Sequence, residues 1–462
     1  MSSLSIDALI KLQKEYFYSG ATQNRHFRIS QLKTLKSAIL KYEDEIIRAC
    51  DADMGKPEQE TVISEMAIPL SQADYTIKGL KGWMKKEKIK TPLGHWPGKS
   101  FIMYEPYGKS LIIAPWNYPF HLAVVPLIGA IAAGNCAVIK PSEVTPNVSE
   151  VINRMIGEFY NPEYIAVVQG DADTSKSLLE QSWDFIFFTG SPPIGKKVME
   201  AASRHLTPVV LELGGKSPCI VDRGINLKVA VRRIMQAKYF NNGQTCVAPD
   251  YLLVHRDIKS EFIKMTDNVL KEFYGDYTKP SPDLAKIVNE RHFNRLINLI
   301  DPHKTILGGQ NNPDNKFIAP TLIETDNWNE PIMQEEIFGP LFPMITFDQP
   351  ETIIEEINHQ PRPLTLYLYT NNKNFQKRTL RETSSGTVVI NDSLVQFAIA
   401  NLPFGGVDGS GMGKYHGEHS FKVFSHRKSI LKKSLWFDVS QRFAPYKLSR
   451  KQAARLFRFF SG

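Results

Sequence analysis

Cysteine is scarce in this sequence, which has four in 462 residues. Cys50, Cys136, Cys219 and Cys246 stand far apart, without CxxC or Cys/His spacing, which argues against a disulfide framework and against a zinc site. No metal is therefore expected. Unpaired thiols suit a reducing compartment, so we expect a cytoplasmic protein in which a cysteine is free to act as a thiolate.

Signals for secretion and for a membrane span are also missing. The N-terminus, MSSLSIDALIKLQKEY, has no basic segment followed by an apolar one, so it is not a signal peptide. Residues 111–139 carry no Lys, Arg, Asp or Glu and have the length of a membrane span. However, Pro115, Pro119 and Pro126 would leave polar groups unsatisfied in lipid, so we interpret the segment as a buried strand–loop–helix–strand core.

Charge of one sign is not in large excess. The net charge is +8, from 56 basic and 48 acidic residues, and we find no nucleic-acid recognition motif. A nucleic acid is therefore not expected as a partner, whereas the basic excess favours anionic ligands such as a dinucleotide. The usual dinucleotide fingerprint, GxGxxG directly after a strand, is absent as well.

The periodicity of apolar residues predicts an α/β protein with at least two domains, because the chain exceeds the roughly 250–300 residues of a single core. The first part of the chain has helical spacing of apolar positions. Beyond it, short apolar runs alternate with helical patterns, which is typical of a parallel sheet built from right-handed βαβ units. Helices are expected near 120–133, 146–159, 173–180, 192–204 and 226–240.

The segment FNNGQTC places Cys246 after a tight turn that contains a glycine. A free thiol, with a reference pKa of about 8.5, is only slightly ionised at pH 7, so positive charge or backbone N–H groups are needed to activate it. Taken alone, a single cysteine is more often a small buried apolar side chain than a nucleophile. The surrounding motif has to decide between the two.

Two polar side chains lie at the ends of expected strands. Glu212 ends the apolar strand PVVLELGG, where it would act as a general base with a pKa raised by burial, or would only cap the next turn. Asn117 follows the strand SLIIAP, at the carboxyl end where open α/β sheets bind ligands. Its amide and the Cys246 N–H would stabilise an oxyanion, a donor being typically worth roughly 3–4 kcal/mol. Taken alone, an Asn shortly after a proline is usually a turn residue.

A glycine-containing turn stands in place of the missing fingerprint. In FTGSPPIGKKV, Gly190 and Gly195 bracket a strand-to-helix turn that also contains Ser191. The N–H groups of this turn would face a pyrophosphate at the helix N-terminus. By spacing alone the signal is weak.

A set of motifs then occurs in one order: PWNYPF, IKPSE, FTGS, LELGGK, GQTC, EEIFGP and LPFGG. By these motifs the chain resembles the aldehyde dehydrogenase superfamily over roughly residues 5–445, and VAPDY, YHG, FSH and RFAPY make it most similar to the class 3 branch. The resemblance implies Cys246 as the nucleophile, Glu212 as the base that activates water and Asn117 as the oxyanion donor. It also implies oxidation of an aldehyde, either medium- or long-chain aliphatic or aromatic, to its carboxylic acid.

The same resemblance implies a nicotinamide cofactor. Lys140 and Glu143, in VIKPSE, match family positions at the adenosine ribose, and Glu336 and Phe338, in EEIFGP, match positions at the nicotinamide ribose. A carboxylate near the ribose would repel a 2′-phosphate, whereas Lys140 would tolerate one, so NAD is expected, with NADP as the alternative. The expected cofactor-binding residues are Lys140, Glu143, Gly190, Ser191, Gly195, Trp116, Glu336 and Phe338.

The architecture implied by the resemblance is a Rossmann-like cofactor domain, an α/β catalytic domain and a small strand arm that bridges the two subunits of a homodimer. The expected parts are 1–85 and 105–211 with a C-terminal return near 400–420 for the cofactor domain, 212–399 for the catalytic domain, 86–104 and 421–442 for the oligomerisation arm, and 443–462 for a basic tail.

The tail has the pattern of a short amphipathic helix. Its apolar face would hold Ala453, Leu456, Phe457 and Phe460, while the polar side is supplied by arginines and a lysine. Such a helix would dock on its own protein, which we favour, or on a second subunit, or as a peripheral contact on an anionic membrane surface.

Three other functions remain open from the sequence. A CoA-acylating aldehyde dehydrogenase would pass the thioester to CoA, and Glu212 argues against this. A thioesterase or esterase would use the same cysteine and glutamate without a nicotinamide, leaving Lys140 and Glu336 unexplained. A binding protein on an inactive scaffold conflicts with the presence of all three catalytic positions. One residue departs from the family pattern, since Asp408 in LPFGGVDGSG stands where glycine is common.

Overall fold

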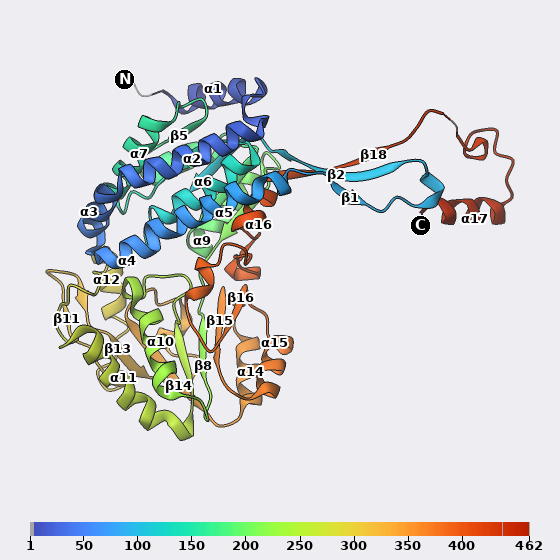
Figure 1. Cartoon of the computed structure of the whole chain (residues 1–462). Helices are drawn as coiled ribbons and strands as arrows, with labels where there is room; N and C mark the ends of the chain where they lie inside the picture. The colour runs from blue at the N-terminus through green and yellow to red at the C-terminus, as the bar shows by residue number, and fades with distance from the viewer. Residues whose placement is uncertain (1–3, 437, 462) are drawn as a thin grey trace.

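A mostly parallel sheet with helices on both faces forms the upper part of the molecule in Figure 1, drawn mainly in blue to green. The computed structural model describes residues 4–436 and 438–461. The strand order is β17-β7-β6-β3-β4-β5, and every pair is parallel except β17 with β7. The strands are β3 (Lys109–Ile113), β4 (Cys136–Lys140), β5 (Ile165–Val167), β6 (Phe185–Thr189), β7 (Val209–Glu212) and β17 (Gly411–Met412).

Alternating side chains of the strands explain why both faces carry helices. Leu111 and Ile113 of β3 pack in one apolar cluster with residues of α1, α8 and α9, while Ile112 between them packs in another with α2, α5, α6 and α7. The helices are α1 (Ile6–Tyr18), α2 (Arg25–Lys41), α3 (Glu43–Met54), α4 (Glu58–Thr61), α5 (Ile68–Trp83), α6 (His121–Ala133), α7 (Pro146–Phe159), α8 (Ala172–Leu179) and α9 (Pro192–Ser203). This alternation confirms the α/β fold with a Rossmann-like sheet.

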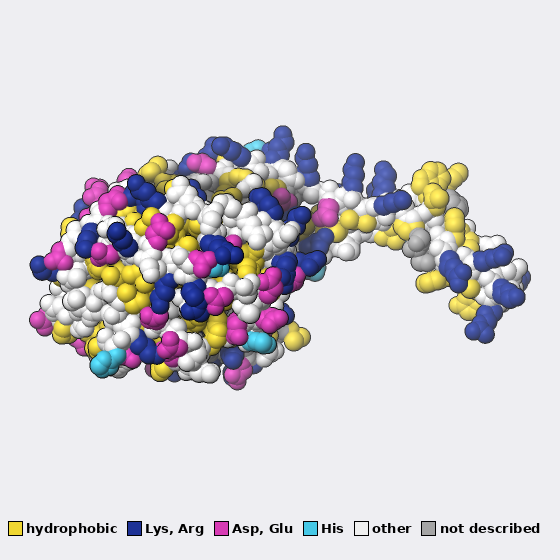
Figure 2. Space-filling view, turned by 90° about the horizontal axis from the view of Figure 1, so that it is seen from below, with side chains coloured by type: hydrophobic (Ala, Val, Ile, Leu, Met, Phe, Trp, Pro, Cys, Tyr) yellow, Lys and Arg dark blue, Asp and Glu magenta, His cyan; other side chains and the backbone are white. Residues whose placement is uncertain are grey.

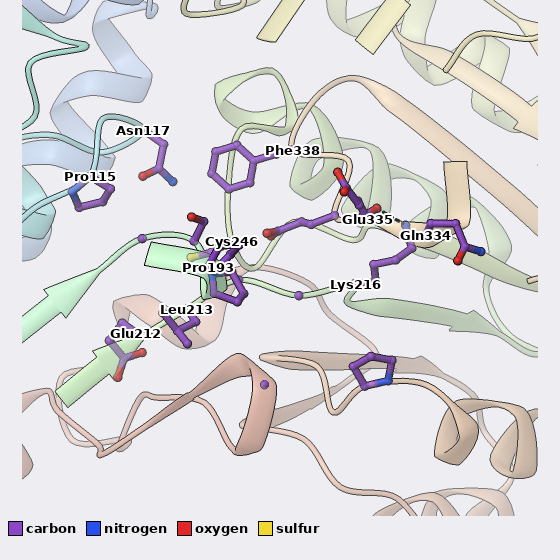
Figure 3. A pocket seen from close by; sticks show the side chains of 18 of the residues that line it. Pro115, Asn117, Pro193, Glu212, Leu213, Lys216, Cys246, Gln334, Glu335 and Phe338 are labelled. Atoms are coloured by element: carbon purple, nitrogen blue, oxygen red, sulfur yellow. Dashed lines mark hydrogen bonds between the residues drawn. The ribbon is translucent and has the colours of Figure 1, made fainter. Parts of the chain in front are cut away.

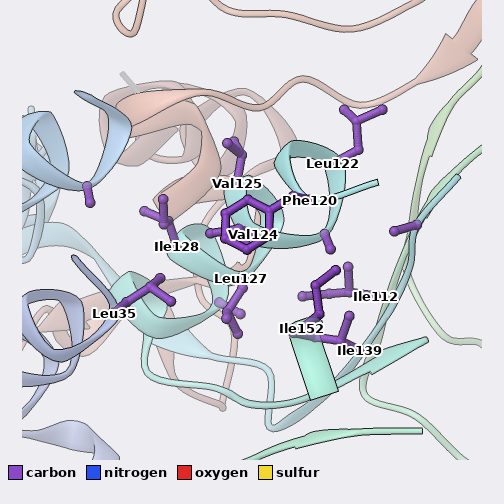
Figure 4. Close-up of a cluster of buried hydrophobic side chains, with 14 of the residues drawn as sticks. Leu35, Ile112, Phe120, Leu122, Val124, Val125, Leu127, Ile128, Ile139 and Ile152 are labelled. Carbon is purple, nitrogen blue, oxygen red and sulfur yellow. The ribbon is translucent and has the colours of Figure 1, made fainter. Parts of the chain in front are cut away.

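The charge-free segment 111–139 is a core element, as the sequence predicts. Every residue of α6 is buried, and Figure 4 shows Phe120 and Val124 within a cluster that also contains Ile112 and Ile139 from the neighbouring strands. Burial on all sides accounts for the uniform apolarity of this helix. Within residues 4–436 and 438–461, no helix has both the length and the apolarity that crossing a bilayer requires.

A second, seven-stranded sheet has the order β10-β13-β14-β9-β8-β15-β16. Its strands are β8 (Pro218–Val221), β9 (Tyr251–His255), β10 (Thr305–Leu307), β13 (Thr321–Glu324), β14 (Leu341–Phe347), β15 (Thr365–Tyr369) and β16 (Thr387–Ile390), and a separate pair is formed by β11 (Asn311–Asn312) and β12 (Phe317–Ile318). One face packs on α10 (Leu227–Tyr239) and α11 (Lys259–Tyr274). The other packs on α12 (Glu290–Ile297), α13 (Pro331–Gln334), α14 (Pro350–His359) and α15 (Lys373–Glu382).

A narrow arm projects from the first sheet (Figure 1). It is a three-stranded antiparallel sheet of β1 (Glu87–Ile89), β2 (Lys99–Pro106) and β18 (Ser425–Lys432). The sequence predicted strand character from residue 421, and this is wrong for the first residues. They belong to α16 (Gly417–Val423), which packs on α5 and α6 because Phe421 is buried there.

The tail forms α17 (Arg450–Ser461), which folds back onto the arm. The ring of Phe460 lies 5.4 Å from that of His95, next to the backbone of Gly94. The expected docking on its own protein is therefore seen at Phe460, while Phe457 is 72% exposed.

Candidate active site

The turn before Cys246 is built from three consecutive residues in the left-handed region. Asn241, Asn242 and Gly243 have φ values of +52°, +54° and +75°, a conformation that Asn and Gly adopt most readily. A Cβ on Gly243 would lie 2.3 Å from the carbonyl oxygen of Gly339, so only glycine fits. The sequence FNNG therefore folds into the tight turn that sets the position of Cys246.

This turn is fixed by buried polar side chains on both sides. The Asn241 N–H donates to the carboxylate of Glu60 at 2.9 Å. The side-chain amide of Gln244 donates to the Lys286 carbonyl at 2.9 Å, and its oxygen accepts from the Val288 N–H at 3.0 Å. These hydrogen bonds hold the loop without a disulfide, although the side-chain oxygens of both asparagines of the turn have no partner among the described residues.

A cavity of about 760 Å³ opens between the two sheets and brings together residues from both. Figure 3 shows Cys246 between Asn117 and Glu212, with Phe338 facing the same space. Of the residues that the sequence singled out, it is lined by Trp116, Asn117, Gly190, Ser191, Glu212, Cys246, Glu336 and Phe338. Lys140, Glu143 and Gly195 are not part of its lining.

The resting thiol of Cys246 is strongly protonated. Its pKa is raised to about 12, mainly by desolvation and in addition by the carboxylates of Glu336 and Glu212, while the N–H groups of Cys246 and Val247 act in the opposite direction. No cation appears among these causes. The sequence reasoning required positive charge or N–H groups near the thiol, and only the N–H groups are found. Attack by sulfur therefore has to be coupled to removal of the thiol proton.

Glu212 ends β7 with a buried and unpaired carboxylate. Neither of its oxygens has a hydrogen-bond partner among the described residues. Burial raises its pKa well above the ordinary value, and the ammonium of Lys414 opposes this only in part. A carboxylate that merely capped the following turn would accept a hydrogen bond from it. Both oxygens are instead available to a bound molecule.

Asn117 is held by hydrogen bonds from its side-chain amide and to its backbone carbonyl. Its side-chain nitrogen donates to the Gln244 carbonyl at 3.1 Å, and its own carbonyl accepts from the Asn241 amide at 2.9 Å. An amide nitrogen carries two hydrogens, so one remains for a ligand in the cavity. This arrangement is consistent with an oxyanion donor beside Cys246.

The turn between β6 and α9 offers fewer N–H groups than the sequence predicted. Pro192 and Pro193 occupy the first two helical positions and have no N–H. The N–H groups of Ile194 and Gly195 donate to the Ser191 carbonyl, and that of Gly190 donates to the Glu212 carbonyl. Within this turn, contacts to an anion are left mainly to Ser191, which is exposed at the cavity.

Gly195 has a packing role instead. A Cβ at this position would lie 2.7 Å from Leu213, the residue that follows β7. The glycine therefore allows α9 to approach the strand closely. The nearby hydroxyl of Thr189, which lines the cavity, is buried without a partner.

Lys140 and Glu143 form an ion pair at the end of β4. The ammonium and the carboxylate lie 2.7 Å apart, with Lys140 buried and Glu143 about half exposed. Because Glu143 already neutralises Lys140, an additional phosphate near them would have to displace this carboxylate. The pair is compatible with the ribose contact implied by the resemblance, at a position beyond the main cavity.

Glu336 and Phe338 form the opposite wall of the cavity. The Glu336 carboxylate packs against Gly214, where a Cβ would come within 2.0 Å of it. Desolvation, with a contribution from Asp250, raises the pKa of Glu336 to about 8. Phe338, at φ +51°, meets the ring of Trp116 edge-on at 5.3 Å. Aromatic edges and one carboxyl group thus face the site of a flat polar ligand.

Sequence reasoning missed two side chains of α12 that also line the cavity. The ring of His292 lies 5.0 Å from Trp116, and Arg295 donates to the carbonyls of Glu336 and Ile337. They stand three apart, on one helical face directly after the N-cap Asn289. That spacing was visible in the sequence, but nothing local connected it with a cysteine more than forty residues away.

A second, smaller cavity of about 40 Å³ is also lined by Cys246 and Glu212. Its wall is mainly aromatic and includes Tyr118, His121, Phe397, Phe404, Tyr415 and His416. Burial is the largest cause that lowers the pKa of both His121 and His416 to about 3, so both rings are neutral. This second cavity is an apolar environment.

Asp408 has a local explanation. It lies at φ +56°, in the region that favours glycine, and its side chain is exposed at the start of a short 3₁₀ turn. Aspartate is among the residues that tolerate this region best. The departure from the family pattern therefore leaves the turn intact.

The two sheets with their helices, and the cavity around Cys246 that they share, are the architecture of an α/β enzyme. The family model described as "Aldehyde dehydrogenase family" matches residues 2–430, and this chain belongs to the aldehyde dehydrogenase family. It is 46% identical to the 4,4'-diaponeurosporen-aldehyde dehydrogenase of Staphylococcus aureus, over 94% of this chain and 95% of that protein. It is 42% identical to the mouse "Aldehyde dehydrogenase, dimeric NADP-preferring", over 93% and 95% of the two chains.

Solved structures agree with this assignment. The substrate-bound state of Staphylococcus aureus AldH matches with a TM-score of 0.95 and 44% identity, covering 98% of this chain and all of that chain. An indole-3-acetaldehyde dehydrogenase in complex with NAD+ matches with a TM-score of 0.84 and 26% identity, covering 93% and 88% of the two chains. The chain is an NAD(P)-dependent aldehyde dehydrogenase.

Proposed function

We propose that the enzyme oxidises an apolar aldehyde to its carboxylic acid through a thioester on Cys246. The observation that carries the proposal is the meeting of Cys246, Asn117 and Glu212 at one cavity, with both oxygens of Glu212 unpaired. A nucleophile, an oxyanion donor and a base are the three groups that this reaction needs from the protein.

The residues of the main cavity fit a nicotinamide cofactor. Its volume is of the order of known cofactor sites, about 300–1,000 Å³. The unpaired Thr189 hydroxyl and the Glu336 carboxyl supply polar contacts, and Trp116 and Phe338 supply aromatic ones. We propose that Ser191 contacts the pyrophosphate and Glu336 the nicotinamide ribose, with Lys140 and Glu143 at the adenosine ribose. Bound NAD(P)+ supplies the acceptor for the hydride that leaves the substrate carbon.

Cys246 begins the reaction by adding its sulfur to the aldehyde carbon. Because burial holds the thiol protonated, we propose that Glu212 receives this proton, directly or through water. The aldehyde oxygen becomes an oxyanion that the free hydrogen of the Asn117 amide and the Cys246 N–H stabilise. Loss of hydride from this thiohemiacetal leaves a thioester, and Glu212 releases the first proton to solvent. Glu212 then takes a proton from water, whose oxygen attacks the thioester, and returns this proton to the departing thiolate, so that the acid and the thiol are released.

The shape of the second cavity supports an apolar substrate. Its aromatic side chains form a narrow wall, and its two histidines are neutral. Tyr118, Phe397 and Phe404 favour an apolar group beside the aldehyde carbon. With about 40 Å³, the cavity has room only for the carbon atoms nearest the aldehyde, so the rest of a medium or long chain, or of a flat unsaturated one, would lie outside it. The name of the Staphylococcus aureus relative specifies a diaponeurosporen-aldehyde, which is consistent with such a substrate.

We also propose that the enzyme acts as a homodimer joined through the arm. The three strands of the arm have exposed or half-exposed side chains over nearly their whole length, and Tyr104 of β2 packs on the core of the same chain, so most of the arm remains uncovered. A sheet of this size is seldom stable without a packed face. One mouse relative is described as dimeric.

The test is formation of NAD(P)H at a panel of aldehydes, with NAD and NADP supplied separately. Cys246→Ala is expected to reduce turnover at least about 10³-fold, because the nucleophile is lost. Cys50→Ala, at a buried cysteine of α3, should leave turnover within about twofold of the unchanged enzyme. Turnover that persists in Cys246→Ala would contradict the thioester mechanism. A product that requires CoA would identify the acylating alternative.

A further inference from the structure

A buried ion pair lies directly behind Asn117. The ammonium of Lys56 and the carboxylate of Glu65 are 2.5 Å apart, and both side chains are completely inaccessible to solvent. Neither residue lines either of the two cavities around Cys246. Two buried charges carry a large desolvation cost unless further hydrogen bonds satisfy them. Both charged groups therefore need further hydrogen-bond partners.

Lys56 contacts the residue that carries the proposed oxyanion donor. Its ammonium donates to the backbone carbonyl of Asn117 at 3.1 Å and lies 4.3 Å from the centre of the Tyr118 ring. The Asn117 carbonyl also accepts from the Asn241 amide, which belongs to the cysteine turn. Two donors thus fix the peptide plane that follows Asn117, and with it the direction of the Asn117 side chain.

Glu65 fixes the other end of the same loop. One of its oxygens accepts from the N–H groups of Phe120 and His121, at 3.2 and 2.9 Å, where α6 begins. A carboxylate is stabilised at a helix N-terminus by the unpaired N–H groups and the helix dipole. Glu65 itself lies in a π-helical turn, Val62–Ala67, a local structure that is frequent at functional sites.

We propose that Lys56 and Glu65 are positioning residues that hold the Asn117 amide in place for the oxyanion. The inference rests on the proposed role of Asn117. Lys56 binds the first residue of the segment 117–121 and Glu65 binds the last. Both contacts are charge-assisted hydrogen bonds, which are stronger than neutral ones. Because it touches no ligand, its removal should alter the chemical step and not the binding of the cofactor.

The test is a double-mutant cycle between Lys56→Met and Asn117→Ala in the full-length enzyme. Lys56→Met keeps the aliphatic stem and removes the ammonium. With octanal as the aldehyde, we expect kcat/KM to fall roughly tenfold to a hundredfold, as for a misplaced catalytic group, while KM for NAD changes less than about twofold. In the Asn117→Ala background, the same substitution should change kcat/KM by less than about twofold, because the group that it positions is gone.

Lys36→Met is the matched control. It removes a lysine of α2 that pairs with Asp74 of α5, neither of which lines a cavity around Cys246, and it should leave kcat/KM unchanged in both backgrounds. If Lys56→Met does not fold, Glu65→Gln replaces it in the cycle, since glutamine keeps an acceptor for the N–H groups of α6. Equal losses in the two backgrounds would overturn the positioning role alone. Full turnover of Asn117→Ala would instead overturn the oxyanion role on which it rests.

Discussion

At the scale of single residues, the charge state of Glu336 affects the pKa of Cys246, after desolvation as the largest cause. The pKa of Glu336 is raised to about 8, so this carboxyl is largely neutral at pH 7 and becomes an anion as the pH rises through 8. The anion is the largest charge effect that raises the pKa of Cys246. Ionisation of Glu336 therefore suppresses the thiolate in the same pH range in which hydroxide begins to form it.

Replacing Glu336 by Gln should remove this suppression. Below pH 7 the two enzymes should be alkylated by iodoacetamide at Cys246 at similar rates, since Gln resembles the neutral carboxyl. Above pH 9 the variant should react faster. The rate should rise about tenfold for each unit by which the Glu336 anion raises the pKa of Cys246 in the unchanged enzyme. The measurement is the alkylation rate of the cofactor-free enzyme by mass spectrometry. The other three cysteines are buried and provide an internal control. A ratio that stays constant across this range would contradict the coupling.

The candidate site was predictable where a short motif contains both the functional residue and the turn or strand end that positions it. Cys246, Glu212 and Asn117 each follow a recognisable turn or strand end, and the structure brings them to one cavity. What the sequence could not show was the electrostatic balance, because a thiol pKa depends on desolvation by distant segments. Lys56 and Glu65 were missed for the same reason. In the sequence Lys56 looks like an ordinary charge of a Gly-Lys-Pro loop and Glu65 like one on a helix, and only the fold buries them together.

At the scale of elements, the turn before Cys246 depends on the absence of a side chain at Gly243. Alanine there would combine a positive φ with a contact of 2.3 Å to the Gly339 carbonyl. We expect Gly243→Ala to lower the free energy of unfolding by roughly 2–3 kcal/mol and to lower kcat through displacement of Cys246. Denaturant unfolding and turnover measure the two effects.

Gly157→Ala provides the matched control for this substitution. Gly157 lies in the exposed last turns of α7, and nothing stands within 4 Å of an added Cβ. Alanine should raise stability by about 0.5 kcal/mol because it is the better helix former, with no change in turnover. If both variants lost stability equally, the special geometry of the cysteine turn would not explain the effect of Gly243→Ala.

The elements themselves were largely predictable because their apolar residues follow the period of each structure. The helices expected near 120–133 and 146–159 correspond to α6 and α7, and the intervening strand to β4. The error at residues 421–423 has a clear cause. Phe421 and Val423 alternate with polar residues as in a strand, but the burial of Phe421 against α5 and α6 favours a helix. Local pattern and tertiary packing conflicted there, and packing decided the structure.

At the scale of the whole molecule, the arm is a part of the chain whose apolar side chains remain exposed to solvent. Figure 2 shows it extending from the body with basic side chains along it and hydrophobic ones near its end. Ile89, Trp96 and Leu431 are among its exposed apolar residues, at 43%, 70% and 52%. Soluble proteins seldom expose apolar side chains together without a partner surface, which is why a second copy of the chain is the proposed partner.

A charge placed on the arm should therefore separate the subunits. We expect the unchanged enzyme to sediment with twice the chain mass of 52.4 kDa, and Leu431→Glu to shift it toward the single-chain mass, because a buried unpaired carboxylate destabilises an apolar interface. Leu40→Glu, at a residue of α2 with 54% exposure, is the control and should leave the mass unchanged. A dimer that persists in Leu431→Glu at low micromolar concentration would place the interface elsewhere. Because Cys246 and its cavity belong to one chain, the dissociated variant should still bind NAD, so loss of the dimer can be distinguished from loss of the fold.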